Sequence, residues 1–250
     1  MMTDLRILGI GDIGEVAAGD DLLTAIQRGL VAADAQLMPG DILAVTHKVV
    51  SKAEGRLVDL RTIEPSPFAA QWAERYGKDP RQTEVVLREA TRVVRMDRGI
   101  IIAETRHGFV CANAGVDASN VGGDMVCLLP LDPDASARKL ARALEQAVGF
   151  VVPVIITDSF GRAWRDGVVN VAIGVAGLLP LADYRGQRDP YGYVLTASVM
   201  AVADELAAAA ELVMGKVDQR PVALIRGYAW QSGNGSGQQL VMRPERDMFR

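Results

Sequence analysis

Short apolar runs and helical apolar spacings follow one another along the chain. Apolar runs bounded by turn residues predict buried strands over Asp41–Val45, over VVPVIIT (residues 151–157) and over VALIRG (residues 222–227). Residues 99–112 (GIIIAETRHGFVCA) predict two short strands about a polar turn. The helices fall between pairs of strands and do not alternate strictly with them. This grouping favours an α+β fold of mixed or antiparallel sheets with packed helices.

Capping residues, prolines and glycines mark the expected helices. The acidic pair Asp20-Asp21, Ser66-Pro67, Asp79-Pro80 and Asp132-Pro133 each suit the start of a helix. An alanine-rich stretch ends at Gly215, and alanine loses least side-chain entropy in a helix. The sequence therefore predicts helices over residues 22–33, 68–76, 81–94, 133–148 and 195–214.

Composition is typical of one globular domain spanning residues 1–250. The chain has 250 residues, 49% of them apolar, which is enough for a substantial core. Its polar, glycine-rich tail from about residue 231 is expected to be loose. Cys111 and Cys127 lie in apolar runs and are expected to be buried, reduced thiols.

Charge and hydropathy exclude two classes of partner. A net charge of −4 offers no basic field, so we expect no nucleic-acid partner held by its phosphates. The amino terminus has acidic residues where a signal peptide needs a basic start, and no apolar stretch approaches a membrane span. A cytoplasmic protein without membrane contact is expected.

Two polar clusters in the first quarter of the chain suit phosphate binding. Gly9–Val16 (GIGDIGEV) carries the glycine spacing of a dinucleotide fingerprint, but the next helix begins too late for a Rossmann turn, and a ligand-free turn explains it equally well. Lys52, in SKAEGR just past the strand ending at Val45, has the charge and reach to contact a phosphate. A solvated run of charges is the alternative.

Two further clusters suit a hard metal ion. Asp117 and Asn120 lie in NAGVDASNV, where carboxylate and amide oxygens suit Mg²⁺ or Mn²⁺, although Asx-turn chemistry also accounts for them. ITDSFGRAWRDG (residues 156–167) places Asp158 and Ser159 at a strand end. Arg162 and Arg165 follow as cationic forks for an anion. Metal ions shared by the two aspartates would clamp a triphosphate; an ordinary salt-bridged turn is the alternative.

Other common catalytic signatures are missing from the sequence. The two histidines, His47 and His107, have no cysteine or histidine at ligand spacing, which argues against zinc. No G-x-S-x-G elbow and no Walker A lysine occur, so serine hydrolase and P-loop readings lack their motifs.

Taken in order, SKAEGR, NAGVDASN, ITDSFGRAWRDGVVNVAIG and DPYGYVLTASVMAVADELAAAAELVMGK resemble the coenzyme F420-0:L-glutamate ligase family, from Gly19 to about Arg226. The resemblance implies a stand-alone homodimeric ligase with that family's fold. It implies that GTP activates the terminal carboxylate of the deazaflavin coenzyme F420-0 as an acyl phosphate. The amine of L-glutamate then forms the amide, and further γ-linked glutamates can follow.

The resemblance also implies roles for individual residues. Asp117 and Asp158 match metal carboxylates for Mg²⁺ or Mn²⁺, with Ser159 at a second metal-binding position and K⁺ as a further candidate ion. Beside them, the cationic side chains already noted lead to the hypothesis that Arg162 or Arg165 holds an anionic substrate near Asp158. The positions that match nucleotide contacts are Ile13, Gly14, Glu15, Val16, His47, Lys52, Asn120, Gly215, Lys216, Val217 and Asp218.

The nucleotide pocket departs from the family pattern at two places. His47 stands where the family commonly has a small hydroxyl residue, and GIGDIGEV lacks the family's Leu-Pro pair. Two alternatives therefore accompany the ligase hypothesis. One is a related γ-glutamyl ligase acting on another acceptor such as a folate, and the other is a nucleotide-hydrolysing or nucleotide-binding protein without ligase activity.

Overall fold

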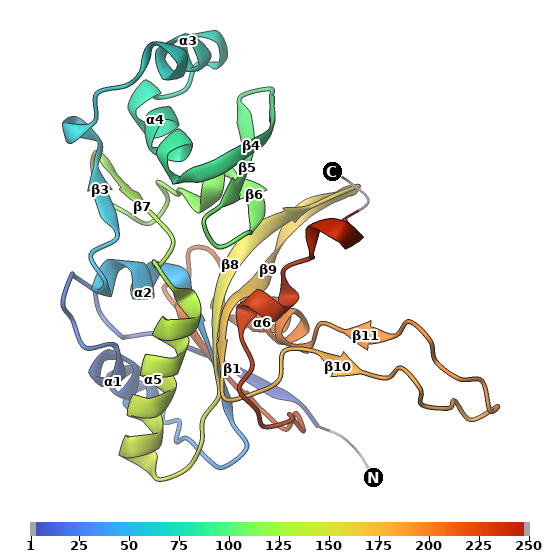
Figure 1. Ribbon diagram of the computed structural model, residues 1–250. Helices are drawn as coiled ribbons and strands as arrows, with labels where there is room; N and C mark the ends of the chain where they lie inside the picture. Colours follow the sequence, from blue (N-terminus) through green and yellow to red (C-terminus); the bar gives the residue numbers. More distant parts are fainter. Residues whose placement is uncertain (1–3, 248–250) are drawn as a thin grey trace.

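A mixed five-stranded sheet forms the centre of the protein, whose computed structural model describes residues 4–247 (Figure 1). Only the β2–β8 pair is parallel, and the other three pairs are antiparallel. The α+β fold predicted from the sequence is therefore confirmed. In spatial order the strands are β1 (Arg6–Ile10), β12 (Val222–Arg226), β2 (Ile42–Thr46), β8 (Val154–Arg162) and β9 (Arg165–Ala176).

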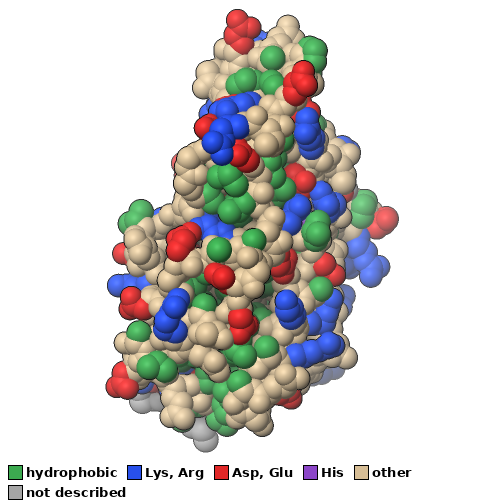
Figure 2. Space-filling model, turned by 90° about the vertical axis from the view of Figure 1, so that its left-hand side faces the viewer, with side chains coloured by type: hydrophobic (Ala, Val, Ile, Leu, Met, Phe, Trp, Pro, Cys, Tyr) green, Lys and Arg blue, Asp and Glu red, His purple; other side chains and the backbone are tan. Residues whose placement is uncertain are grey.

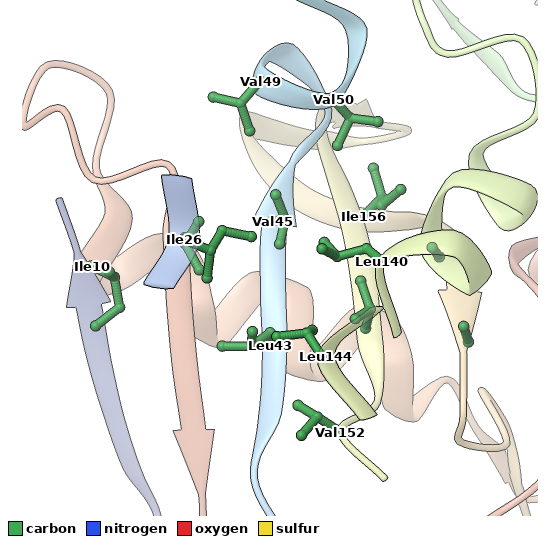
Figure 3. Close-up of a cluster of buried hydrophobic side chains, with 14 of the residues drawn as sticks. Ile10, Ile26, Leu43, Val45, Val49, Val50, Leu140, Leu144, Val152 and Ile156 are labelled. Atoms are coloured by element: carbon green, nitrogen blue, oxygen red, sulfur yellow. The ribbon is translucent and has the colours of Figure 1, made fainter. Parts of the chain in front are cut away.

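Helices cover both faces of this sheet, which explains why its central strands are apolar throughout. Leu43 and Val45 of β2 pack under the helices of one face (Figure 3). Ile42 and Ala44 alternate with them and pack against the helix of the other face. The first face carries α1 (Leu22–Ala32), α2 (His47–Ala53) and α5 (Pro133–Val148), and the second carries α6 (Val202–Met214).

A smaller lobe extends from one end of the sheet (Figure 1). It has its own cluster of buried residues, which includes Val85, Ile101 and Val126. The lobe contains β3 (Leu57–Asp59), η1 (Leu60–Thr62), α3 (Pro67–Tyr76), α4 (Pro80–Glu89), β4 (Ala90–Asp97), β5 (Ile100–Thr105), β6 (Val110–Ala112), η2 (Asn113–Gly115) and β7 (Met125–Cys127).

A narrow arm projects from the other side of the body (Figure 1). It is held by the short pair β10 (Ala182–Asp183) and β11 (Val199–Met200) and by an isolated bridge between Arg188 and Val194. Two short 3₁₀ turns, η3 (Gly237–Leu240) and η4 (Pro244–Arg246), follow the last strand.

Two helix predictions were too long, because β-branched residues favour strands where a sheet partner is available. Residues 90–94 continue as β4, in which Val93 pairs with Ala103. Residues 195–201 belong to the arm, and α6 begins only at Val202, with Asp204 and Glu205 in its first turn. The remaining predicted helices and strands are confirmed, apart from small shifts at their ends and the changes around the site.

The carboxyl-terminal tail is packed, contrary to expectation. The buried Asp134 carboxylate at the start of α5 accepts the backbone N–H of Gly237 at 2.6 Å, and Gln238 donates to the carbonyl of His107 at 2.9 Å. Leu240 and Val241 add apolar contacts with the core, so the tail is held by both hydrogen bonds and packing. Residues 248–250 of the tail lie outside the described residues.

Surface and thiols agree with the sequence. Acidic and basic side chains are mixed over the face shown in Figure 2, which is the left-hand side of Figure 1. Cys111 and Cys127 are buried and free. Within residues 4–247, no helix has the length and apolarity needed to cross a membrane.

The ion pair between Asp41 and Arg226 joins the start of β2 to the end of β12. Asp41 is 0% exposed and Arg226 is 30% exposed, and Nε lies 2.7 Å from Oδ1. Replacing Arg226 by alanine leaves a buried carboxylate without its cation, so we expect a loss of about 3 kcal/mol in the free energy of unfolding. Urea denaturation measures it. Arg185→Ala breaks the exposed pair with Asp183 and is expected to leave the midpoint unchanged; equal effects of the two changes would contradict this account.

Candidate active site

A cleft of about 1230 Å³ opens where β2, β8 and β9 meet the lobe and the end of α6. Segments far apart in the sequence form its walls, and most of the predicted site residues meet there. Those lining it are Ile13, Gly14, Glu15, Val16, Lys52, Asp117, Asn120, Asp158, Ser159, Gly215, Lys216, Val217 and Asp218. Their shared position is what a single binding site requires, while their individual roles stay predictions.

The glycine-rich loop after β1 forms one wall of the cleft. Ile13 and Val16 bury their side chains in the core, which anchors the loop and leaves Gly14 and Glu15 exposed between them. Arg28 of α1 donates to the carbonyl oxygens of Asp12 and Ile13. Gly14 has a φ of +75°, and a Cβ there would collide with the Arg28 guanidinium. Arg28 and the buried side chains of Ile13 and Val16 therefore fix the conformation of the loop, whose backbone at Gly14 lines the cleft.

The helix α2 supplies two lysines to the cleft. Lys52 was expected just past the end of a strand. The structure shows that β2 passes directly into α2 and that Lys52 lies in the last turn of this helix. Lys48 and Lys52 are four residues apart, so they share one face of the helix. Lys52 pairs with Glu15 across the cleft. This spacing directs the ammonium groups of both lysines into the cleft.

Asp117 lies opposite Lys48. Its backbone exchanges hydrogen bonds with Cys127 of β7, which fixes the position of the residue. The carboxylate is 2.7 Å from Lys48 Nζ and accepts the backbone N–H of Ser119 at 2.6 Å. Burial on its own raises the pKa of Asp117, but the Lys48 ammonium and the hydrogen bonds from Ser119 outweigh it and lower the pKa below its ordinary value.

Asp158 was predicted at the end of a strand. It lies instead inside the long strand β8. The strand β8 continues to Arg162 and turns back into β9 as a hairpin, because Asp158 pairs with Val171 and Gly161 with Val168. His47 of α2 is 1% exposed, and its Nε2 lies 3.3 Å from Asp158 Oδ1. That approach has no hydrogen-bond geometry, so Nε2 is a buried polar atom without a hydrogen-bond partner in the described chain.

Ser159 faces the opposite side of β8 from Asp158, as neighbouring residues in a strand do. Its hydroxyl donates to Asn170 Oδ1 at 2.6 Å and accepts from Lys216. Asn170 in turn donates to Glu211 at 2.7 Å, and Glu211 is 3.3 Å from Lys216. This network joins β8, β9, α6 and the loop that follows α6 at the cleft wall.

Three predicted site residues do not line the cleft. His47 lies buried behind Asp158, where its Nδ1 is 3.3 Å from Ser51 Oγ. Arg162 and Arg165 lie at the exposed turn between β8 and β9, where Arg162 donates to the carbonyl of Asp166 at 3.1 Å. That the two arginines hold a substrate remains a prediction.

The chemistry of the cleft suits an anion together with a hard cation. Lys48, Lys52 and Lys216 bring positive charge to it, while Asp117, Asp158 and Ser159 offer oxygen donors. No group of three or more acidic, histidine or cysteine side chains within residues 4–247 is arranged to hold a metal ion alone. Mg²⁺ is ordinarily held by one or two carboxylates and completed by phosphate oxygens and water, so the donor set fits such an ion when a phosphate is bound with it.

Sequence reasoning missed Lys48, Asn170 and Glu211 at this site. The four-residue spacing of Lys48 and Lys52 was a usable signal. Asn170 is the one polar side chain within the apolar run VVNVAIGVA, and a buried amide in a strand requires partners. Glu211 lies among apolar residues at the end of α6, and only the fold brings it to the cleft.

Replacing Lys48 by methionine keeps most of the length of the unbranched side chain and removes its charge. Without the Lys48 ammonium, the effect of burial is less compensated, so we expect the pKa of the Asp117 carboxyl to rise. The stability that the ionised carboxylate provides is then lost at a higher pH when the protein is acidified. Carboxyl ¹³C NMR titration measures the pKa. Lys52→Met is the control, because Lys52 pairs with the exposed Glu15. An unchanged pKa of Asp117 in Lys48→Met would contradict the conclusion that the Lys48 ammonium lowers this pKa.

Similarity to known proteins extends over almost the whole chain. Residues 11–227 match the family model described as F420-0:Gamma-glutamyl ligase. The chain is 47% identical over 249 residues to a coenzyme F420:L-glutamate ligase of Methanothermobacter thermautotrophicus, covering 98% of this chain and 99% of the relative. It is 51% identical over 251 residues to one of Methanopyrus kandleri, covering 98% of each. The matched family model and these two relatives show that the chain belongs to the F420-0:γ-glutamyl ligase family.

Proposed function

We propose that this protein uses GTP to join L-glutamate to the terminal carboxylate of coenzyme F420-0, with further γ-linked additions to the product. The observation that carries the proposal is the convergence on one cleft of three lysines with Asp117 and Asp158. The cleft, at about 1230 Å³, has room for a nucleotide and a second substrate. The relatives' names supply the acceptor and the amino acid.

Membership of this family makes the protein a ligase that forms carbon–nitrogen bonds. In the proposed reaction a carboxylate oxygen of the acceptor attacks the γ-phosphorus of GTP, and GDP leaves. The glutamate amine then attacks the acyl carbon and loses a proton, and inorganic phosphate leaves with the former carboxylate oxygen. No covalent bond to the protein is required.

The side chains of the cleft have complementary parts in this proposal. Lys48, Lys52 and Lys216 would bind phosphate oxygens, and the loop at Gly14 would contact the nucleotide through its backbone. Asp117 and Asp158 would hold Mg²⁺ or Mn²⁺, and Ser159, on the opposite side of β8, would lie at a second metal-binding position, with K⁺ as a further candidate ion. A bound divalent ion neutralises charge on the transferring phosphoryl group.

Asp158→Asn tests the role of this carboxylate. The amide keeps the size of the side chain but loses its negative charge, so we expect ligation to fall by roughly 100-fold or more with the melting temperature retained. Asp166→Asn, an exposed change on the same hairpin, is expected to keep normal rates. Ligation by Asp158→Asn at the wild-type rate would exclude a catalytic role for the carboxylate.

Phosphate release separates the ligase from its alternatives. A ligase releases phosphate from GTP only when acceptor and glutamate are both present, whereas a hydrolase needs neither. Starting from F420-0 labelled with ¹⁸O in its carboxylate, the acyl-phosphate route transfers one label to inorganic phosphate. A folate-specific homologue would release phosphate with folate and not with F420-0.

We also propose that the protein is a homodimer and that the arm forms its contact surface. The arm exposes Tyr191 (97%), Tyr193 (63%) and Met200 (44%), which is unusual for a projecting segment surrounded by water. The apolar run VVNVAIGVAGLLPL (residues 168–181) is not available for such a contact, because most of it lies in β9, whose residues from Asn170 onward are largely buried.

Tyr191→Glu combined with Tyr193→Glu places charge on this surface, so we expect a dimer to dissociate into monomers. Sedimentation velocity measures the mass. Val31→Glu changes an equally exposed apolar residue of α1 and is expected to leave the dimer intact. A dimer that survives the double change would exclude the arm as the interface.

A further inference from the structure

A second, more apolar cavity of about 370 Å³ lies between the β8–β9 hairpin, the lobe and the carboxyl-terminal segment. Its walls include Phe109, Phe160, Val171 and Val241, with Asp204 at its side. The rings of Phe109 and Phe160 meet edge-on at 6.1 Å. The volume falls in the range of small-molecule pockets, roughly 300–1,000 Å³.

The second cavity adjoins the cleft along β8. Asp158 lines the cleft, and Phe160 lines the second cavity. The two residues are separated by one position, so their side chains project from the same face of the strand about 7 Å apart. On β9, Asn170 lines the cleft and Val171 lines the second cavity. The two cavities are therefore neighbours at the β8–β9 hairpin.

The charges of the second cavity argue against the other two substrates. Among the described lining residues Arg92 is the basic one, and it is 2.9 Å from Glu104 in an ion pair. A triphosphate would lack cations here, and glutamate would leave its charges against apolar walls. An uncharged planar ring suits the two phenylalanines, because aromatic rings pack favourably edge-on or offset.

Asp204 gives the second cavity a specific polar contact. Its Oδ1 accepts the backbone N–H of Ala172 at 2.9 Å, and a ligand's ring N–H would bind to the other oxygen, Oδ2. Burial raises the pKa of this carboxyl, opposed in part by the Ala172 hydrogen bond. A hydrogen-bonding group in a mostly apolar pocket fixes the orientation of a ring without requiring a charge on it. Asp247 also lines this cavity.

We propose that the second cavity binds the planar heteroaromatic ring of the acceptor, so that its carboxylate-bearing chain runs along β8 to Asp158. This inference rests on the proposed function for the identity of the acceptor. The ring, held apart from the reacting carboxylate, would select the acceptor by binding energy remote from the chemistry.

Val94→Trp tests the inference with a matched control. Val94 and Val93 are neighbours on β4 and are 38% and 39% exposed, but only Val94 lines the second cavity. We expect Val94→Trp to raise the KM for F420-0 by about tenfold or more, while the KM values for GTP and glutamate stay within roughly twofold. Val93→Trp is expected to match the wild type. Asp204→Asn, which is isosteric, is a second variant and is expected to raise the same KM selectively.

A binding measurement separates this inference from the proposed function. A 5-deazaflavin with only a ribityl chain cannot react, and calorimetry is expected to detect its binding to the wild type and to Val93→Trp but not to Val94→Trp. If the wild type fails to ligate F420-0 yet binds this probe selectively, the proposed function fails and the ring site stands. If both tryptophan variants fold and keep the wild-type KM for F420-0, the ring site is wrong.

Discussion

The parallel pairing of β2 with β8 is the constraint on which the site depends. Thr46 at the end of β2 lies opposite Thr157 of β8. The residues that follow these two threonines, His47 and Asp158, are therefore brought side by side at the same end of the strand pair. Their side chains meet there, with His47 Nε2 3.3 Å from Asp158 Oδ1. The residues behind this edge, including Val45 and Ile156, are 0% exposed, so the pairing cannot slip without exposing the core.

Paired charges are the second feature of the cleft. Glu15, Asp117 and Glu211 each lie beside a lysine. A phosphate competes for the lysines in these pairs, and a divalent cation competes for carboxylates. A ligand that brings both therefore replaces each broken ion pair with a new one, and the cost of removing charged side chains from their partners is offset.

Local patterns predicted much of the fold, and motifs predicted most of the cleft. The capped helices α1, α3 and α5 and the apolar strands were predictable because caps, prolines and apolar runs act over a few residues. The conversion of residues 90–94 to strand depends on β5, and the packing of the tail depends on Asp134, which lies far away in the sequence. Glu211 was missed for the same reason, since its position at the site is a tertiary property.

The sequence also placed His47 in the site by resemblance, and Arg162 and Arg165 there as cationic groups for an anion. The fold separates all three from the cleft lining. His47 lies against Asp158 from within the core, so any effect on the reaction passes through that carboxylate. The arginines lie beyond it at the turn between β8 and β9. Asp158 and Arg162 thus belong to one sequence motif but lie in different surroundings. The reason is that β8 continues to Arg162, beyond the point where the strand was expected to end.

The proposed ligase activity is tested most directly by measuring the mass of the acceptor after a complete reaction. Purified protein is incubated with GTP, Mn²⁺, L-glutamate and coenzyme F420-0, and the acceptor is analysed by mass spectrometry together with the nucleotide. The account predicts a gain of whole glutamyl units with GDP formed in proportion. GTP consumed without any gain in acceptor mass would contradict it.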